Sequence, residues 1–269
     1  MATNAAELKS RSLVAVIGPD WRDFLQGLLS QDVETLQPGE LRFGALLTPQ
    51  GKLLFDLFIL GGDDGCWLDV AADRREALIQ RLTIYKLRAK VEIVAVEAPI
   101  WALWGGASPG WPADPRLPAL GWRGYGLETP AADLTDEAAY DAMRLALGVP
   151  DPARDFPPET AYPIEANFDL LNGIDFQKGC FVGQETTSRM KRRGAIKSRM
   201  LPIDFDGPAP GFGAEVLAGT LRAGEVHTGV GGRAMALLRL DRIEGASLTV
   251  DDRPVTVETP AYFDIKPQA

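Results

Sequence analysis

The sequence has very few of the side chains that bind transition metals. It contains one histidine, His227, and two cysteines, Cys66 and Cys180, which stand 114 positions apart. This set excludes a disulfide framework and a His-rich or paired-cysteine zinc site. Because His227 stands in a polar alternating run, we expect it on the surface of a strand. Two unpaired cysteines fit a reducing cytosol.

Long apolar segments are also missing. The apolar run near the N-terminus, residues 13–18, is far shorter than a signal-peptide core, and no segment approaches the 18 or more apolar residues of a membrane span. An Arg- and Ser-rich leader is missing too, which favours a bacterial cytosol over a mitochondrial matrix. We therefore expect a soluble cytoplasmic protein that does not bind membranes.

Positive charge is scarce overall but concentrated in one place. A net charge of -9 argues against direct binding of nucleic acid. Residues 189–199 nevertheless hold six basic residues and no acid, so the rest of the chain carries -15. A solvated helix end and an anion-binding surface are both open interpretations. This segment is called the basic strip and consists of Arg189, Lys191, Arg192, Arg193, Lys197 and Arg199.

The remaining pattern predicts an α+β fold. With 269 residues and 46% hydrophobic content, the chain can form two domains or one large one. We expect an amphipathic helix over 20–33, a hairpin over 43–60, and two further helices over 73–87 and 135–147. From residue 201 onward, short apolar runs separated by Gly- and Asp-rich turns predict a small antiparallel barrel.

The most informative stretch spans residues 175–189. In it Cys180 stands near Lys178 and between two glycines, while residues 184–190 contain neither Gly nor Pro and predict a helix. Cys180 would then precede a helix N-terminus, where the amide dipoles and the ammonium of Lys178 favour a thiolate. A lone cysteine is more often a small buried hydrophobe, so chemistry alone leaves both interpretations open.

Residues 178–189 resemble the Lys-Gly-Cys-Tyr/Phe-x-Gly-Gln-Glu-x-x-x-Arg signature of the folate-binding YgfZ-type family. These proteins are factors of iron-sulfur cluster assembly and are related to the aminomethyltransferase (T-protein) of glycine cleavage. Similar family patterns cover nearly the whole chain, at residues 24–33, 47–52, 85–91 and 163–167. The resemblance implies a T-protein-like folate-binding region with ferredoxin-like elements over residues 1–198 and a C-terminal β-barrel over 199–269.

The resemblance also implies a site. Tetrahydrofolate would occupy a central pocket, with Cys180 and Lys178 as the reactive residues at its rim. Gln184, Glu185 and Arg189 would belong to the cofactor-binding motif. Glu185 and Arg189 are also spaced to form an i,i+4 ion pair on the predicted helix.

Two further acids stand in apolar surroundings. Glu165 either caps a helix or accepts hydrogen bonds from the amino group and ring N–H of a pterin. A T-protein glutamate in this region contacts the pterin, so the resemblance supports the second role. Asp56 interrupts an apolar strand, so it lies either on a solvated face or in a polar pocket.

One departure from T-protein bears on activity. T-protein uses an aspartate on the first long helix after the third strand, and Ala77 stands at or near that position here. Aminomethyl transfer is therefore doubtful. We expect a tetrahydrofolate-binding factor that assembles or maintains iron-sulfur enzymes, including tRNA-modifying ones, together with those enzymes or other assembly proteins as partners. Any cluster would be transient or shared, since clusters normally take four thiolates.

Two alternatives remain. One is a folate-dependent aminomethyltransferase or related one-carbon transferase, in which Asp56 or Asp73 serves as the acid. The other is a protein- or tRNA-binding module that uses only the basic strip.

Overall fold

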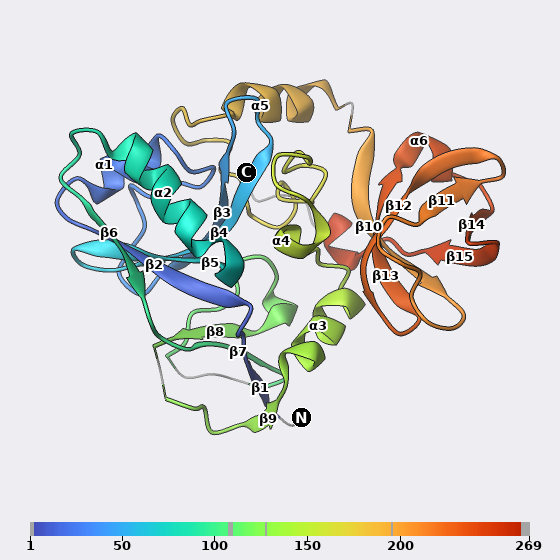
Figure 1. Ribbon diagram of the computed structural model, residues 1–269, viewed down its shortest axis with the longest axis horizontal. Coiled ribbons are helices and arrows are strands. Elements are labelled where there is room, and N and C mark those ends of the chain that lie inside the picture. Colours follow the sequence, from blue (N-terminus) through green and yellow to red (C-terminus); the bar gives the residue numbers. More distant parts are fainter. Residues whose placement is uncertain (1–2, 107–109, 127, 195, 265–269) are drawn as a thin grey trace.

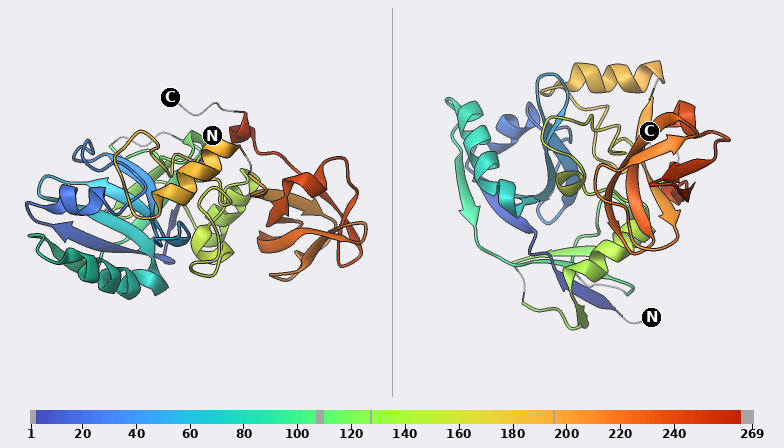
Figure 2. Two further views of the ribbon diagram at one scale, coloured as in Figure 1. Left: turned by 90° about the horizontal axis from the view of Figure 1, so that it is seen from above. Right: turned by 45° about the vertical axis from the view of Figure 1, so that its right-hand side comes forward.

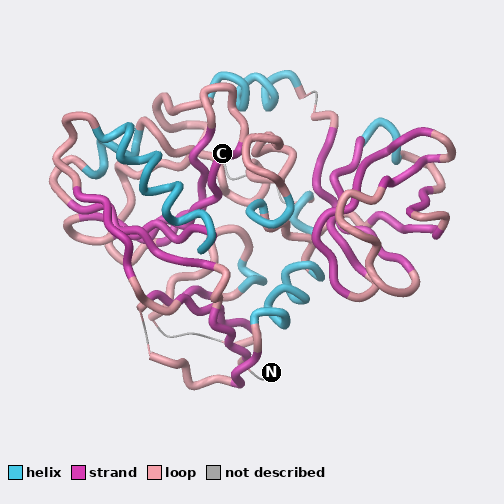
Figure 3. Tube along the Cα trace, viewed as in Figure 1, coloured by secondary structure: helices cyan, strands magenta, loops and turns pink. Residues whose placement is uncertain are grey.

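The computed structural model describes residues 3–106, 110–126, 128–194 and 196–264. Two sheets form one part of the molecule and a closed barrel forms the other, with helix α5 lying across the top between them (Figure 1). The same arrangement is seen from above in Figure 2, and Figure 3 distinguishes the helices, strands and loops along the chain. The expected α+β class with a C-terminal antiparallel barrel is therefore confirmed.

The first sheet has five strands in the order β3-β4-β5-β2-β6 and is antiparallel throughout. Helices α1 and α2 cover one of its faces, and Leu78 and Leu82 of α2 are fully buried there. Burying each leucine contributes about 1.5–3 kcal/mol. The elements are β2 (Arg11–Ile17), α1 (Trp21–Gln26), β3 (Leu41–Leu47), β4 (Leu53–Gly61), β5 (Gly65–Ala71), η1 (Ala72–Arg74), α2 (Arg75–Lys86) and β6 (Glu92–Val96).

The helix expected over residues 20–33 is much shorter than predicted, because α1 ends at Gln26. The apolar residues that suggested a longer helix are buried in an irregular segment instead, and Leu29 forms a β-bridge with Leu46. Side chains replace helical hydrogen bonds there: the Gln26 amide accepts from the Val33 N–H at 2.8 Å and donates to Asp32 at 2.7 Å.

The second sheet has four strands in the order β8-β7-β1-β9, with β1 and β9 parallel. The helix expected over 135–147 is confirmed as α3, and Asp136 caps it by accepting from the Ala139 N–H at 2.9 Å. The elements are β1 (Asn4–Glu7), β7 (Ile100–Trp104), η2 (Pro118–Leu120), β8 (Trp122–Tyr125), β9 (Asp133–Thr135), α3 (Glu137–Ala146) and α4 (Pro152–Asp155).

Six strands close the barrel in the order β10-β13-β12-β11-β14-β15, around an apolar core. Within the described residues, no helix is both long and apolar enough to span a membrane. The elements are α5 (Gln184–Arg193), which precedes the barrel, then β10 (Ser198–Phe205), β11 (Glu215–Ala218), β12 (Leu221–Val230), β13 (Arg233–Arg239), α6 (Leu240–Ile243), β14 (Leu248–Val250), β15 (Arg253–Val257) and η3 (Ala261–Phe263).

His227 lies in a strand as expected, but the prediction of a surface position is wrong, because the residue is 3% exposed. The register of β12 against β13 shifts between Val226 and Gly229, and this irregularity includes His227. The imidazole packs 5.0 Å from the ring of Phe156, and its Nδ1 donates to the carbonyl of Asp155. The ring therefore helps to join α4 to the barrel.

Candidate functional site

The candidate site is the loop of residues 173–183, here called the cysteine loop. Lys178 holds this loop in place, because its Nζ lies 2.7, 2.6 and 2.8 Å from the carbonyl oxygens of Gln26, Leu29 and Gln31. Gln26 is the last residue of α1, where carbonyls lack helical partners, and Leu29 and Gln31 lie in the irregular segment after it. An ammonium has three N–H groups to donate to these three carbonyls. Burial lowers the pKa of Lys178 to about 8, against the opposing effect of nearby carboxylates.

Further hydrogen bonds join the cysteine loop to the segment after α1. The Ser30 hydroxyl donates to the Gly173 carbonyl at 2.7 Å, the Asp175 N–H donates to the Ser30 carbonyl at 2.9 Å, and the Val182 N–H donates to the Gly27 carbonyl at 3.1 Å. The loop is thus fixed at both ends and at Lys178.

Cys180 is an exposed residue in this fixed loop. It precedes α5, which begins at Gln184, so the predicted helix is confirmed. Lys178 uses its donors on backbone carbonyls, so its observed contacts are those of a residue that positions the loop.

Two glycines bring the start of α5 against the β3–β4 turn. Gly183 has φ +81°, and a Cβ there would lie 2.5 Å from the Thr48 carbonyl oxygen. Gly51 has φ +83°, and its Cβ would lie 2.9 Å from the Cβ of Thr186. Both positions require glycine for conformation and for space. By contrast, nothing lies within 4 Å of a Cβ built on Gly179.

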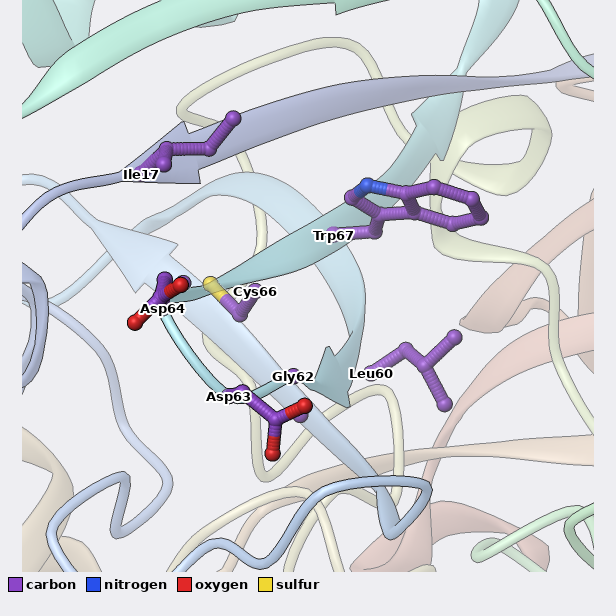
Figure 4. Close-up of a pocket in the computed structure, with 9 residues that line it drawn as sticks. Ile17, Leu60, Gly62, Asp63, Asp64, Cys66 and Trp67 are labelled. Carbon is purple, nitrogen blue, oxygen red and sulfur yellow. The ribbon is translucent and has the colours of Figure 1, made fainter.

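The second cysteine is buried. Cys66 is 3% exposed, and burial raises the pKa of its thiol. It lies at an open hollow of about 350 Å³ at the β4–β5 hairpin, lined also by Ile17, Leu60 and Trp67 (Figure 4). Within the part of the chain that the structure describes, no group of three or more His, Cys, Asp or Glu residues could hold a metal ion.

The other predicted site residues fall into two groups. Gln184 and Glu185 line an open groove of about 710 Å³ beside α5. Arg189 is exposed on the same helix, but Glu185 and Arg189 do not form the expected ion pair. Glu165 is half-buried elsewhere, and its Oε2 accepts from the Tyr162 N–H at 2.8 Å. Residues 163–172 form turns and not a helix, so Glu165 does not cap a helix, and its contact with Tyr162 stabilises a turn instead.

Sequence reasoning missed a buried network of ion pairs where both sheets meet α3 and α4. Arg11 donates to Asp69 at 2.6 Å and to Asp56 at 2.8 Å, and Arg123 donates to Asp69 at 2.8 Å and to Asp114 at 3.1 Å. Asp56 therefore lies in a polar pocket, the second of its two open alternatives. Burial alone would raise the pKa of Asp114, but Arg116 and Arg123 lower it to about 2.

The space left inside this network is small. The cavity that remains beside Arg11, Asp56 and Arg123 is about 20 Å³, which is space for about one water molecule. The carboxylates and guanidinium groups that line it are already paired with one another. A pterin ring does not fit into this pocket as it stands.

Comparison with known proteins places the chain in a family. Residues 197–264 match the family model described as the CAF17 C-terminal beta-barrel domain. In the solved structure of the glycine cleavage system aminomethyltransferase T from Bartonella henselae, the fold matches with a TM-score of 0.81, at 18% identity, over 97% of this chain and 86% of that one. This likeness confirms the expected T-protein-like fold.

The expected cytoplasmic location is wrong on these comparisons, because the relatives from Phaeosphaeria nodorum, Neurospora crassa, human and mouse are all named as mitochondrial. Unpaired cysteines indicate only that thiols stay reduced. Cysteine usage therefore could not distinguish one reducing compartment from another.

Two relatives define the relationship by sequence. The iron-sulfur cluster assembly factor IBA57 homolog of Phaeosphaeria nodorum is 36% identical over 241 residues, which cover 80% of this chain and 58% of that protein. The chain thus spans less than two thirds of that relative's length. Human iron-sulfur cluster assembly factor IBA57 is 31% identical over 278 residues, which cover 88% of this chain and 78% of the human protein. The chain therefore belongs to the IBA57 family.

Proposed function

We propose that this chain is an iron-sulfur cluster assembly factor in which Cys180 supplies one thiolate to a cluster shared with a partner protein. The observation that carries the proposal is an exposed thiol in a loop that Lys178 holds against the end of α1 and the segment after it. The family relationship supports the same role, because the relatives are named as iron-sulfur cluster assembly factors.

The shared cluster follows from the ligand count. Clusters are normally held by four thiolates, whereas the two cysteines of this chain are one exposed and one buried. The other ligands must then come from a partner. The hydrogen bonds on both sides of Cys180 restrict the backbone of the loop, so less conformational entropy is lost when the partner binds.

The neighbouring helix favours an anionic group at this place. The first N–H groups of α5 lack partners within the helix and carry partial positive charge. A cluster with thiolate ligands is anionic, so the start of α5 would stabilise it near Cys180.

Complementation tests the proposed function. In cells that lack the native copy, we expect wild type to restore the activity of iron-sulfur enzymes, including those that modify tRNA, and Cys180→Ser to fail. Cys66→Ala serves as the matched control, because that thiol is buried away from the loop. Full activity with Cys180→Ser would show that this thiol is not a cluster ligand.

The resemblance also raised tetrahydrofolate as a ligand, and the proposed role does not need it. The pocket at the ion-pair network is too small, and one oxygen of Glu165 is already bonded to Tyr162. We expect no saturable quenching of tryptophan fluorescence when tetrahydrofolate is added. Saturable quenching that Glu165→Gln weakens would overturn this expectation and place a folate at Glu165.

The structure gives little support to the alternative of a one-carbon transferase. Ala77 is exposed on α2 and brings no acid. Of the two candidate substitutes, Asp56 is bound by Arg11 at 2.8 Å, and Asp73 is exposed in η1. Neither is positioned as a free proton-transferring acid in an enclosed pocket.

A further inference from the structure

We propose that the exposed side of α5 is the surface on which an acidic partner protein docks beside Cys180. This inference rests on the proposed function and specifies the chemistry of the partner. Its basis is a group of cations here called the outer cations, which consists of Arg189, Lys191, Arg192 and Lys197.

The outer cations have no counter-charges of their own. All four are exposed, and among the described residues none of them lies within 4.0 Å of a carboxylate. Arg199 of the basic strip differs, because it is buried and donates to Asp169 at 2.9 and 2.7 Å. The side chain of Arg193 lies outside the described part of the structure.

A simpler explanation accounts for only part of this charge. Cations in the last turn of a helix interact favourably with its carbonyl end, and this applies to Lys191 and Arg192. Arg189 stands one turn earlier, where it faces Arg192 at i,i+3 and repels it. Lys197 follows the helix altogether. An acidic surface supplied from outside would satisfy all of them.

The groove beside α5 gives the surface a shape. It has a volume of about 710 Å³ and is lined by Phe176, Gln184, Glu185, Ser188, Lys191 and Arg192. The Nζ of Lys191 lies 3.6 Å from the centre of the Phe176 ring. A partner side chain with an apolar body can therefore pack in the groove while neighbouring carboxylates contact the cations.

The groove is close to the thiol along the chain. Phe176 and Gln184 line it, and each stands four positions from Cys180. Four residues span at most about 14 Å, so the Cα of Cys180 lies within that distance of both. A protein docked in the groove can bring its own cysteines to this thiol.

The partner is a protein rather than a nucleic acid for two reasons. The cations form a short patch on a chain of net charge -9, whereas nucleic-acid binding draws on many phosphate contacts. The missing cluster ligands are also thiolates, which a protein supplies.

The electrostatic part of the proposal is tested with two disulfide probes of different charge. The Cys180 thiolate attacks either probe, forms a mixed disulfide and releases one thiol of the probe. The dianionic probe is 5,5′-dithiobis(2-nitrobenzoate) and the neutral probe is 2,2′-dithiodipyridine. We compare Lys191→Glu/Arg192→Glu with Arg88→Glu/Lys90→Glu, which makes the same change of net charge on exposed residues near α2.

In low salt we expect Lys191→Glu/Arg192→Glu to react with the dianionic probe about five- to tenfold more slowly than wild type does. With the neutral probe its rate should lie within about twofold of the wild-type rate. The control variant should match wild type with both probes, and about 1 M salt should remove the difference. Equal slowing in both variants would show an effect of net charge alone and would overturn the proposal.

Complementation separates this inference from the proposed function. We expect Lys191→Glu/Arg192→Glu, shown to be folded by its unfolding curve, to lose most iron-sulfur enzyme activity, while Arg88→Glu/Lys90→Glu keeps it. If the first variant is fully active while Cys180→Ser is inactive, the docking surface is refuted and the cluster role stands. Tight, salt-sensitive binding of a U12 RNA that the first variant abolishes would instead assign the patch to nucleic acid.

Discussion

Replacing Lys178 by methionine tests how the cysteine loop is held. Methionine keeps an apolar stem of similar length but removes all three N–H donors. The carbonyls of Gln26, Leu29 and Gln31 then lose the ammonium at 2.6–2.8 Å. A hydrogen bond to a charged group contributes about 1.5–3 kcal/mol to stability, so the loss of three of them is strongly destabilising before other effects are counted.

A second effect opposes this loss. Burial lowers the pKa of Lys178 from its ordinary 10.5 to about 8, which corresponds to a cost of about 3 kcal/mol for keeping the amine charged. Methionine avoids that cost. We therefore expect the free energy of unfolding to fall by about 1–3 kcal/mol at pH 7, measured by urea denaturation.

The pH dependence provides a signature of this lysine. Because the pKa is lower in the folded state than in the unfolded state, the folded protein binds fewer protons between pH 8 and 10.5. The stability of wild type relative to Lys178→Met should therefore rise across that window, by about 2–3 kcal/mol near pH 10. Below pH 8 the difference should stay constant.

Lys197→Met is the matched control, because Lys197 is exposed. We expect it to change the free energy of unfolding by less than about 0.5 kcal/mol at any pH. The reasoning is refuted if Lys178→Met is no less stable than Lys197→Met at pH 7, or if their difference is independent of pH up to 10.

Two further substitutions test the buried contacts, both by urea denaturation. Asp69→Asn leaves Arg11 and Arg123 without their shared carboxylate, and we expect the free energy of unfolding to fall by about 3–5 kcal/mol. A fall of less than about 1 kcal/mol would mean that water reaches the network. Gly183→Ala should lower the free energy of unfolding by about 2–4 kcal/mol, because φ is +81° there and the new Cβ would lie 2.5 Å from the Thr48 carbonyl oxygen. Gly194→Ala should lower it by only about 1 kcal/mol, because φ is +60° but no atom lies within 4 Å of the new Cβ. Equal losses would contradict the close packing at Gly183.

The local pattern of the sequence predicted much of the fold. Apolar periodicity placed the β3–β4 hairpin, α2 and α3, and the regular spacing of turns predicted the barrel. The helix prediction was wrong at residues 27–33, because apolar residues buried in a loop can have the same spacing as those on a helix. The polar groups of Gln26 and Asp32 that satisfy this loop backbone have no distinctive spacing.

The site was harder to predict, because its contacts join distant segments. Lys178 binds backbone carbonyls, which have no side-chain identity to recognise in a sequence. The ion-pair network draws Arg11, Asp56, Asp69 and Arg123 from four strands. Asp56 alone was noticeable, as an acid inside an apolar strand, and nothing in the sequence identified its partners. The position and exposure of Cys180 therefore needed the structure, although its motif did not.

The contact between Lys178 and the segment after α1 has a consequence for how the protein is made. The bonded residues are separated by 147 to 152 positions in the chain. During synthesis the N-terminal segment must wait until Lys178 has emerged, and contacts of such long range form late in folding. Cys180 acquires its fixed position only at that stage. The partner proposed above, which would recognise the assembled surface, would therefore bind finished molecules and not incomplete chains.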